Sequence, residues 1–439
     1  MPYDVSLIGP VAMALIASLM RRRLTPRWAR VFAVWVTLIL AATVFLVWPG
    51  LTTEHWRSIL IVVIDVVAAT SAWDSVFWLA EHPHMALHRY YLWWALFWVA
   101  LLAIALAHNL ALAWLAVEFS TLASGALVVE MGDRHALEAA WKYIVIASVG
   151  LVLGLIGIVF LYASLQGQRL GWATLNYSNL QAHFMHIPSI IRQLATILLI
   201  SGFGTKAGLV PFHTWLPDAH SEAPSPVSGL LSGVLLGLSL FTVARVVQTV
   251  PVPSTVYLSG NHLFTIFGTI SVVVGSLALL VQRDIKRLLA YSSIEQVGLI
   301  AVALGVGTKA AFMVALWQFV LHAVIKSSLF YGAGHLTVVY HTKQLDKITG
   351  LMSRHPVGAI FWALGILALA GLPPLGLAYT EWQILTQLLS HQAMWVAILL
   401  FGALTLTFAA LGYHLMRTLW GPVDMTDSGQ TAPPAERVV

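Results

Sequence analysis

The sequence predicts an all-α membrane protein of about thirteen transmembrane helices. Of its 439 residues, 59% are hydrophobic and only 9% are charged, and the mean hydropathy is +0.84. Apolar runs of about 20 residues alternate with short polar joints, as in a polytopic helical protein. The runs are continuous rather than alternating in polarity, which excludes the strands of a membrane β-barrel. The same composition excludes a soluble enzyme.

Thirteen apolar runs define the expected helices. In chain order they cover residues 5–20, 31–48, 58–79, 91–107, 109–129, 140–163, 190–212, 226–248, 263–282, 286–306, 310–336, 357–388 and 395–419. We expect no cleavable signal, because the basic cluster Arg21-Arg22-Arg23 follows the first run instead of preceding it.

The chain contains no cysteine, which excludes a thiolate-ligated iron–sulfur cluster, a c-type haem and a disulfide. We therefore expect no cofactor and no metal here, and any electron transfer must occur in another subunit. An isoelectric point near 9.4 would suggest nucleic acid in a soluble chain. Here the Lys and Arg residues gather at helix ends, so no nucleic-acid partner is expected.

Basic residues mark the odd-numbered joints between helices. Those joints hold Arg21, Arg22, Arg23, Arg27, Arg30, Arg89, Arg134, Arg283, Lys286, Arg287, Lys343, Lys347 and Arg354. Even joints hold little beyond Arg57 and Arg169. The positive-inside rule therefore places the N-terminus outside and the C-terminus in the cytoplasm of a bacterial or archaeal cytoplasmic membrane. The polar tail at 421–439 is expected to be disordered.

The seventh and twelfth runs are expected to be broken helices. Lys206 lies between Gly204 and Gly208, and Pro211 follows; the twelfth run carries the stretch AGLPPLG before Glu381. Proline removes a backbone donor, which a membrane tolerates only where protein or water satisfies the freed carbonyls. A charge inside lipid is costly, so Lys206 is a candidate functional residue.

The two breaks indicate an internal repeat. If helices four to eight and nine to thirteen form two units, each break falls in the fourth helix of its unit, a pattern typical of an ion path at midplane. Both units have an odd number of helices, so they must be inverted relative to each other. The expected organisation is residues 1–90 as three N-terminal helices, 91–250 and 251–420 as two five-helix repeats, and 421–439 as a cytoplasmic tail.

Two motifs carry a family resemblance. KAGLVPFHTWLPDAHSEAPSPVS, from Lys206 to Ser228, and RDIKRLLAYSSIEQVGL, from Arg283 to Leu299, resemble the antiporter-like subunits of respiratory complex I, multisubunit sodium/proton antiporters and group 4 membrane-bound hydrogenases. The resemblance covers roughly residues 90–420, and the sixth helix is most similar to the hydrogenase-4 and formate hydrogenlyase component F branch. It implies fourteen core helices, proton translocation along a polar axis and a separate peripheral arm for redox chemistry.

The resemblance implies roles for five residues. Glu118 in the fifth helix matches the glutamate that pairs with the broken-helix lysine, Lys206; a static ion pair tying the two helices is the alternative. His322 and Lys326, at i and i+4 on one face, match the central relay, because imidazole exchanges protons near neutral pH. A packing histidine is the alternative for His322. Glu381 matches the terminal acid that exchanges protons with the far side, and the competing interpretation is an interfacial glutamate.

Further candidates lie near the joints. Lys286 and Arg287 match a family motif, although their place at a helix start favours orientation anchors. His213 and Asp218, together with His220 and Glu222, are assigned to the loop after the seventh helix, where they would line proton entry from the cytoplasm. All six follow from the two quoted motifs.

Two departures from the family pattern matter. Where many relatives carry a lysine or histidine in the eighth helix, this chain offers only Gly237, so either water bridges the gap or the unit transmits conformational coupling without pumping. A fourteenth helix is not expected, since the sequence ends soon after Trp420. A partner subunit or lipid would cover the face it normally occupies.

The sequence thus predicts a proton-translocating subunit of a complex I-like or group 4 hydrogenase-type assembly, with no redox centre of its own and other membrane subunits as partners. One alternative is a subunit of a cation/proton antiporter. Another is the membrane half of an inorganic-carbon uptake complex with a zinc-bearing partner. A third is a non-pumping scaffold. Copurifying iron–sulfur and nickel proteins would favour the complex I-like or hydrogenase-type assembly, and antiporter subunits or a zinc protein would favour the antiporter or the carbon-uptake complex.

Membrane orientation can be measured with fusions after Val439. Because basic residues gather on odd joints, a reporter that works only in the cytoplasm should be active there, and one that works only outside should be silent. The opposite result would contradict both the orientation and the count of thirteen helices.

Overall fold

The computed structural model describes residues 4–19, 25–47, 56–83, 85–253 and 258–422. In chain order the helices are α1 (Asp4–Leu19), α2 (Pro26–Val47), α3 (Trp56–Glu81), α4 (Leu87–Leu106), α5 (Leu110–Val129), α6 (Arg134–Ser164), α7 (Tyr177–His183), α8 (Ser189–Ala207), α9 (Trp215–Glu222), α10 (Ser225–Leu230), α11 (Leu236–Thr249), α12 (Gly260–Leu279), α13 (Ile285–Val306), α14 (Lys309–Val339), α15 (Leu351–Arg354), α16 (Pro356–Leu369), α17 (Gly376–Ser390) and α18 (Met394–Trp420). A π-helical turn, η6 (Leu231–Leu235), joins α10 to α11.

The predicted all-helical membrane fold is confirmed. Ten helices among the described residues are long and apolar enough to cross a membrane, and two shorter apolar helices cover Leu7–Leu19 and Pro356–Leu369. The chain is therefore a multi-pass membrane protein. The count of thirteen spans and the two repeats stay predictions, and most of the expected tail, residues 423–439, lies outside the described part.

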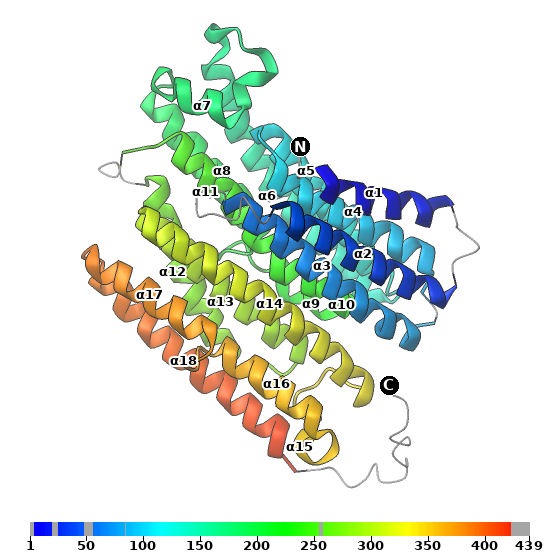
Figure 1. Cartoon of the computed structure of the whole chain (residues 1–439). Helices are drawn as coiled ribbons and strands as arrows, with labels where there is room; N and C mark the ends of the chain where they lie inside the picture. The colour runs from blue at the N-terminus through cyan, green and yellow to red at the C-terminus, as the bar shows by residue number, and fades with distance from the viewer. Residues whose placement is uncertain (1–3, 20–24, 48–55, 84, 254–257, 423–439) are drawn as a thin grey trace.

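The long helices form one bundle with α14 near its middle (Figure 1). This 31-residue helix is about 45 Å long and contacts α3, α10, α13, α16 and α17. Helices α1 to α3 pack beside α4, and α16 to α18 form the opposite edge (Figure 1). The short helix α7 projects beyond the ends of α6 and α8 (Figure 1). Residues on α14 are thus in reach of both ends of the bundle.

Several helices begin directly after a residue whose side chain caps the first turn. Asn109 Oδ1 accepts from Ala111 N at 2.9 Å at the start of α5, and Asp133 Oδ1 accepts from Ala136 N at 2.6 Å at the start of α6. A capping oxygen satisfies one of the free N–H groups of the first turn. The Asp133 cap explains why α6 begins at Arg134, six residues before the start expected from hydropathy.

The two predicted breaks are present and begin alike. After α8, Gly208 has a positive φ of 78°, and Leu209 N donates to Gly204 O at 2.9 Å. After α16, Gly371 has a φ of 71°, and Leu372 N donates to Leu367 O at 3.0 Å. Each is a Schellman termination, which needs a residue in the left-handed region and satisfies carbonyls at the helix end.

The segment after the first break corrects one expectation. Asp218, His220 and Glu222 were assigned to a loop, but they lie on the helix α9 (Trp215–Glu222). Pro217 falls in its first turn, where a missing backbone N–H costs no hydrogen bond. The helical structure is therefore interrupted after α8 and continues in α9.

Glycines allow α12 and α13 to pack at very short range. A Cβ built on Gly298 would lie 2.7 Å from Gly268 O, and one built on Gly275 would lie 2.8 Å from the Cβ of Glu295. Small residues let backbones approach in this way in membrane bundles, where packing replaces the hydrophobic effect as the driving force. The contact fixes the position of Glu295 on α13.

The importance of this contact can be tested with two matched substitutions. Gly298→Ala should lower the stability of the protein by about 1–3 kcal/mol, because the added methyl overpacks the interface with α12. Gly412→Ala on α18, where a Cβ would meet nothing within 4 Å, should be neutral or slightly stabilising. Thermal unfolding in detergent measures both, and equal midpoints would contradict the close packing of α12 on α13.

Candidate functional site

Lys206 lies in the last turn of α8 with no exposed surface. Its Nζ donates to Thr121 Oγ1 of α5 at 2.8 Å and to the hydroxyl of Tyr143 on α6. That hydroxyl shares a further 2.7 Å hydrogen bond with Ser124, and Nζ lies 4.5 Å from the centre of the Tyr143 ring. Hydroxyl groups and an aromatic face thus surround the ammonium in place of water.

Glu118 lies one helical turn before Thr121 on α5. Ser148 Oγ donates to its Oε1 at 2.6 Å, and its buried Oε2 has no hydrogen-bond partner among the described residues. Glu118 and Lys206 interact electrostatically, but no direct ion pair joins them in the described part of the chain. A static ion pair, the alternative considered above, is therefore not what holds α8 to α5.

His322 and Lys326 lie one turn apart on α14 and are both buried. The His322 Nε2–H donates to Ser232 O at 3.3 Å, which leaves Nδ1 as the accepting nitrogen of a neutral ring. Nδ1 is buried without a partner among the described residues. Lys326 Nζ instead turns to α13, where it donates to Leu289 O at 2.7 Å and to Ser292 Oγ.

The partner of His322 lies in the π-helical turn η6. Turns of this kind interrupt the regular bonding of a helix and occur frequently at functional sites. Ser232 contributes its carbonyl to His322, while its hydroxyl shares a 2.7 Å hydrogen bond with Ser293 of α13. The turn therefore links α10 and α11 to both α13 and α14.

Glu381 lies in the second turn of α17 and is only 7% exposed. This burial does not fit the interfacial alternative. Gln296 Nε2 donates to Glu381 Oε1 at 3.2 Å and to Glu295 Oε2 at 3.1 Å. Gln318 Nε2 donates in turn to Gln296 Oε1 at 2.5 Å, and Thr380 Oγ1 donates to Gln318. An amide network therefore joins two buried carboxyl groups from different helices.

Glu295, Gln296 and Gln318 were not singled out from the sequence. All three are fully buried inside otherwise apolar helices, α13 and α14. A charged side chain in the middle of a transmembrane run marks a functional candidate by default, and that signal was present at Glu295.

The remaining predicted residues gather near α9 but do not form one cluster. Asp218 accepts from Arg287 at 2.6 Å and lies 3.8 Å from Lys142. His213 lies in the break before α9 and is half-buried, with its ring 6.4 Å from that of Tyr291. Burial lowers the pKa of His213, because desolvation disfavours the charged ring.

Lys286 is 5% exposed, and its Nζ donates to Ala223 O at 2.9 Å. The ammonium therefore binds the C-terminal end of α9, and the role of Lys286 as an orientation anchor stays a prediction. A cation at this end also interacts favourably with the helix dipole. The described residues contain no group of three or more His, Cys, Asp or Glu that could hold a metal ion.

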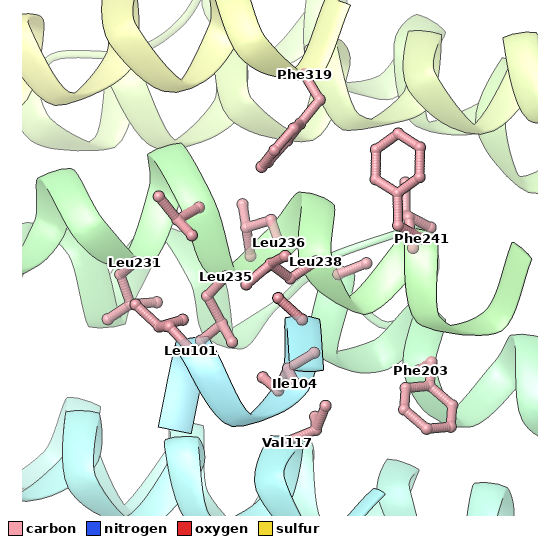
Figure 2. Packing of buried hydrophobic residues seen from close by; sticks show 14 of the residues in the cluster. Leu101, Ile104, Val117, Phe203, Leu231, Leu235, Leu236, Leu238, Phe241 and Phe319 are labelled. Carbon is pink, nitrogen blue, oxygen red and sulfur yellow. The ribbon is translucent and has the colours of Figure 1, made fainter. Parts of the chain in front are cut away.

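The position of Gly237 is closed by apolar side chains. The ring of Phe319 on α14 occupies the place that a Cβ of Gly237 would take. Figure 2 shows Phe319 pointing at Leu236 and Leu238, with Phe241 beside them. Phe319 therefore fills with hydrocarbon the position where many relatives carry a basic side chain. The contact between His322 and Ser232 lies about one turn away, toward η6.

Comparison with known proteins agrees with this architecture. The sequence profile of the family described as NADH:quinone oxidoreductase/Mrp antiporter, transmembrane, matches residues 107–407. The hydrogenase-4 component F homolog of Methylacidiphilum infernorum is 35% identical over 320 residues, covering 72% of this chain and 66% of the relative. Hydrogenase-4 component B of Escherichia coli is 33% identical over 306 residues, covering 67% and 44%. The chain thus spans less than two thirds of both relatives.

A solved structure supports the same fold. A chain in the membrane-bound sulfane sulfur reductase, an archaeal respiratory membrane complex, superimposes with a TM-score of 0.87 at 23% identity, over 99% of this chain and 90% of the other. Residues 107–407, which match the family profile, contain α5 to α17 and every buried charged residue described above. The chain therefore belongs to the NADH:quinone oxidoreductase/Mrp antiporter transmembrane family.

Proposed function

We propose that this chain is a proton-translocating subunit of a multisubunit membrane complex. The observation that carries the proposal is the state of Lys206 and Lys326, which are both fully buried. Among the described residues their ammonium groups bind hydroxyl and carbonyl oxygens and no carboxylate. A purely structural lysine in a bundle would be paired with an acid, because an unpaired buried charge is costly. A lysine that gains and loses a proton needs neutral partners instead.

In this proposal protons enter near α9 and pass along the bundle. His213 lies beside the break that ends α8, close in sequence to Lys206. Glu118 interacts electrostatically with Lys206, so movement between them would change the proton affinity of the amine. His322 and Lys326 then form the central step, and Glu381 exchanges protons with the far side.

Two inverted five-helix repeats at 91–250 and 251–420, beside three helices at 1–90, would organise this path. The identical terminations at Gly208 and Gly371 support this division. So do Glu118 and Glu295, each of which lies on the second helix of its unit. Inverted repeats place their broken helices around a shared midplane site.

The energy would come from other chains. We propose a complex I-like or group 4 hydrogenase-type assembly, because the relatives described above are hydrogenase-4 components. A peripheral redox arm would supply the driving force, with further membrane subunits and lipid around the bundle. An antiporter assembly, or a carbon-uptake complex with a zinc-bearing partner, would use the same membrane path with a different source of energy.

Phe319 favours one second candidate, a non-pumping scaffold. With its ring against Gly237, this position holds an apolar side chain in place of a titratable one. A chain with this arrangement could transmit conformational change between neighbouring subunits without conducting protons. The two candidates make opposite predictions for substitutions on α14.

The first test concerns Glu118 and Lys206. Glu118→Gln and Lys206→Ala should each reduce proton translocation by the complex in vesicles, and the double variant should lose less than the sum of the two effects, because the groups act as one pair. Glu138→Gln, at an exposed residue paired with Lys142 at 2.5 Å, is the control. Full translocation by both single variants at normal abundance would remove the pair from the path.

The second test separates pump from scaffold. Lys326→Ala should lower proton translocation about a hundredfold if the chain conducts, while Lys309→Ala at the exposed start of the same helix should have no effect. Phe319→Ala should leave translocation intact or raise it in a pump. A scaffold would instead show unchanged translocation in Lys326→Ala and weaker subunit association in Phe319→Ala, where a core cavity forms.

A further inference from the structure

Glu295 lies where two parts of the proposed path would otherwise be separate. It is fully buried on α13, one helical turn after Ser292, which binds Lys326. Residues three apart on a helix are neighbours on its surface, so the Lys326 ammonium lies beside the Glu295 side chain, with which it interacts electrostatically. On its other side Glu295 reaches Glu381 through the shared Gln296 amide.

The two carboxyl groups belong to one electrostatic unit. Gln296 Nε2 bridges Glu295 Oε2 at 3.1 Å and Glu381 Oε1 at 3.2 Å. Glu295 Oε1 is buried with no partner among the described residues. The second oxygen of Glu381, Oε2, lies where a Cβ on Gly371 would be. Two carboxyl groups that share one amide NH2 group and are removed from water cannot both be ionised without a large cost in free energy.

We propose that Glu295 and Glu381 form a dyad that holds a single proton and passes it from Lys326 toward the end of the path. A proton leaves the Lys326 ammonium for the Glu295 carboxylate, which leaves a neutral amine and a neutral acid. Glu381 then releases the proton that it already held toward the far side, and the Glu295 proton moves to the Glu381 carboxylate, so that the pair again holds one proton and a charge of −1. Lys326 is recharged by the next proton from the His322 side.

The glutamines are positioning residues in this dyad. Gln318 donates to the oxygen of the Gln296 amide and is itself held by Thr380, so the NH2 group of Gln296 faces the two acids. Gly371 lets the Glu381 carboxyl approach the break after α16, because any side chain at this position would collide with Glu381 Oε2. Gly275 gives Glu295 the corresponding room against α12.

The inference rests on the proposed function, but its main test does not need translocation. The infrared band of protonated carboxyl groups would be recorded in H2O and D2O on the purified complex, with wild-type chain and variants. In the wild type the band should correspond to one protonated carboxyl group. Glu295→Gln and Glu381→Gln should each keep a band of the same area at a shifted frequency, because the remaining buried acid holds the proton. The double variant should lose the band, and Glu138→Gln should leave the spectrum unchanged.

Other outcomes overturn the dyad. If one single substitution alone abolishes the band, the proton belongs to that residue and is not shared. Two separate bands, one lost in each single variant and both in the double, would mean that the acids protonate independently. Should Glu295→Gln fail to assemble, Glu381→Gln alone decides, since a band of full area from Glu295 is expected there.

Two further measurements separate the roles. Gln296→Leu should keep the band but move it to higher frequency, because a carboxyl C=O loses a hydrogen bond; an unmoved band would remove Gln296 from its positioning role. Translocation should fall about tenfold or more in Glu295→Gln and recover in part in Glu295→Asp. Normal translocation in Lys326→Ala with the expected infrared result would refute the pump and leave the proton-sharing pair in place.

Discussion

The cost of placing charge where no water can reach governs the interior of this protein. The two fully buried ammonium groups each bind two oxygens of neighbouring helices: Lys206 binds hydroxyls of α5 and α6, and Lys326 binds a hydroxyl and a carbonyl of α13. These oxygens replace hydration only while the helices keep their spacing. Helix packing and proton chemistry therefore depend on the same contacts.

Interrupted helices supply the polar groups that regular helices cannot. An unbroken helix uses its own carbonyls and offers a ligand only its side chains. Here the breaks after α8 and α16 and the π-helical turn η6 each leave backbone groups beside a titratable residue: Lys206, Glu381 and His322 respectively. The π-helical turn η6 is enclosed by other helices, which is a condition under which a membrane tolerates irregular backbone, whereas Pro211 and Thr214 of the first break and Pro373 and Pro374 of the second are exposed.

Hydropathy and proline placement predicted the apolar runs, both breaks and the burial of Lys206, because each of these follows from the local cost of lipid exposure, whereas Lys326 and Glu381 were candidates through the family resemblance. What the sequence could not predict was which groups meet. Lys206 binds Thr121 and Tyr143 instead of Glu118, since the choice depends on how α5, α6 and α8 pack. The same holds for the Phe319 ring over Gly237 and for the Gln296 bridge.

The helix α9 was also not predicted from the sequence, because its position depends on packing. The contacts that attach α9 to its neighbours respond differently to salt. Three side chains from α13 and the segment after α14 hold it: Arg287 and Lys343, which make partly exposed ion pairs of 2.6 and 2.8 Å, and Lys286, which makes a buried bond. Dissolved salt screens exposed pairs, over about 8 Å at physiological strength, and leaves buried ones almost untouched. Ionic strength can therefore loosen α9 from one side while the bonds around Lys206 and Lys326 stay as they are.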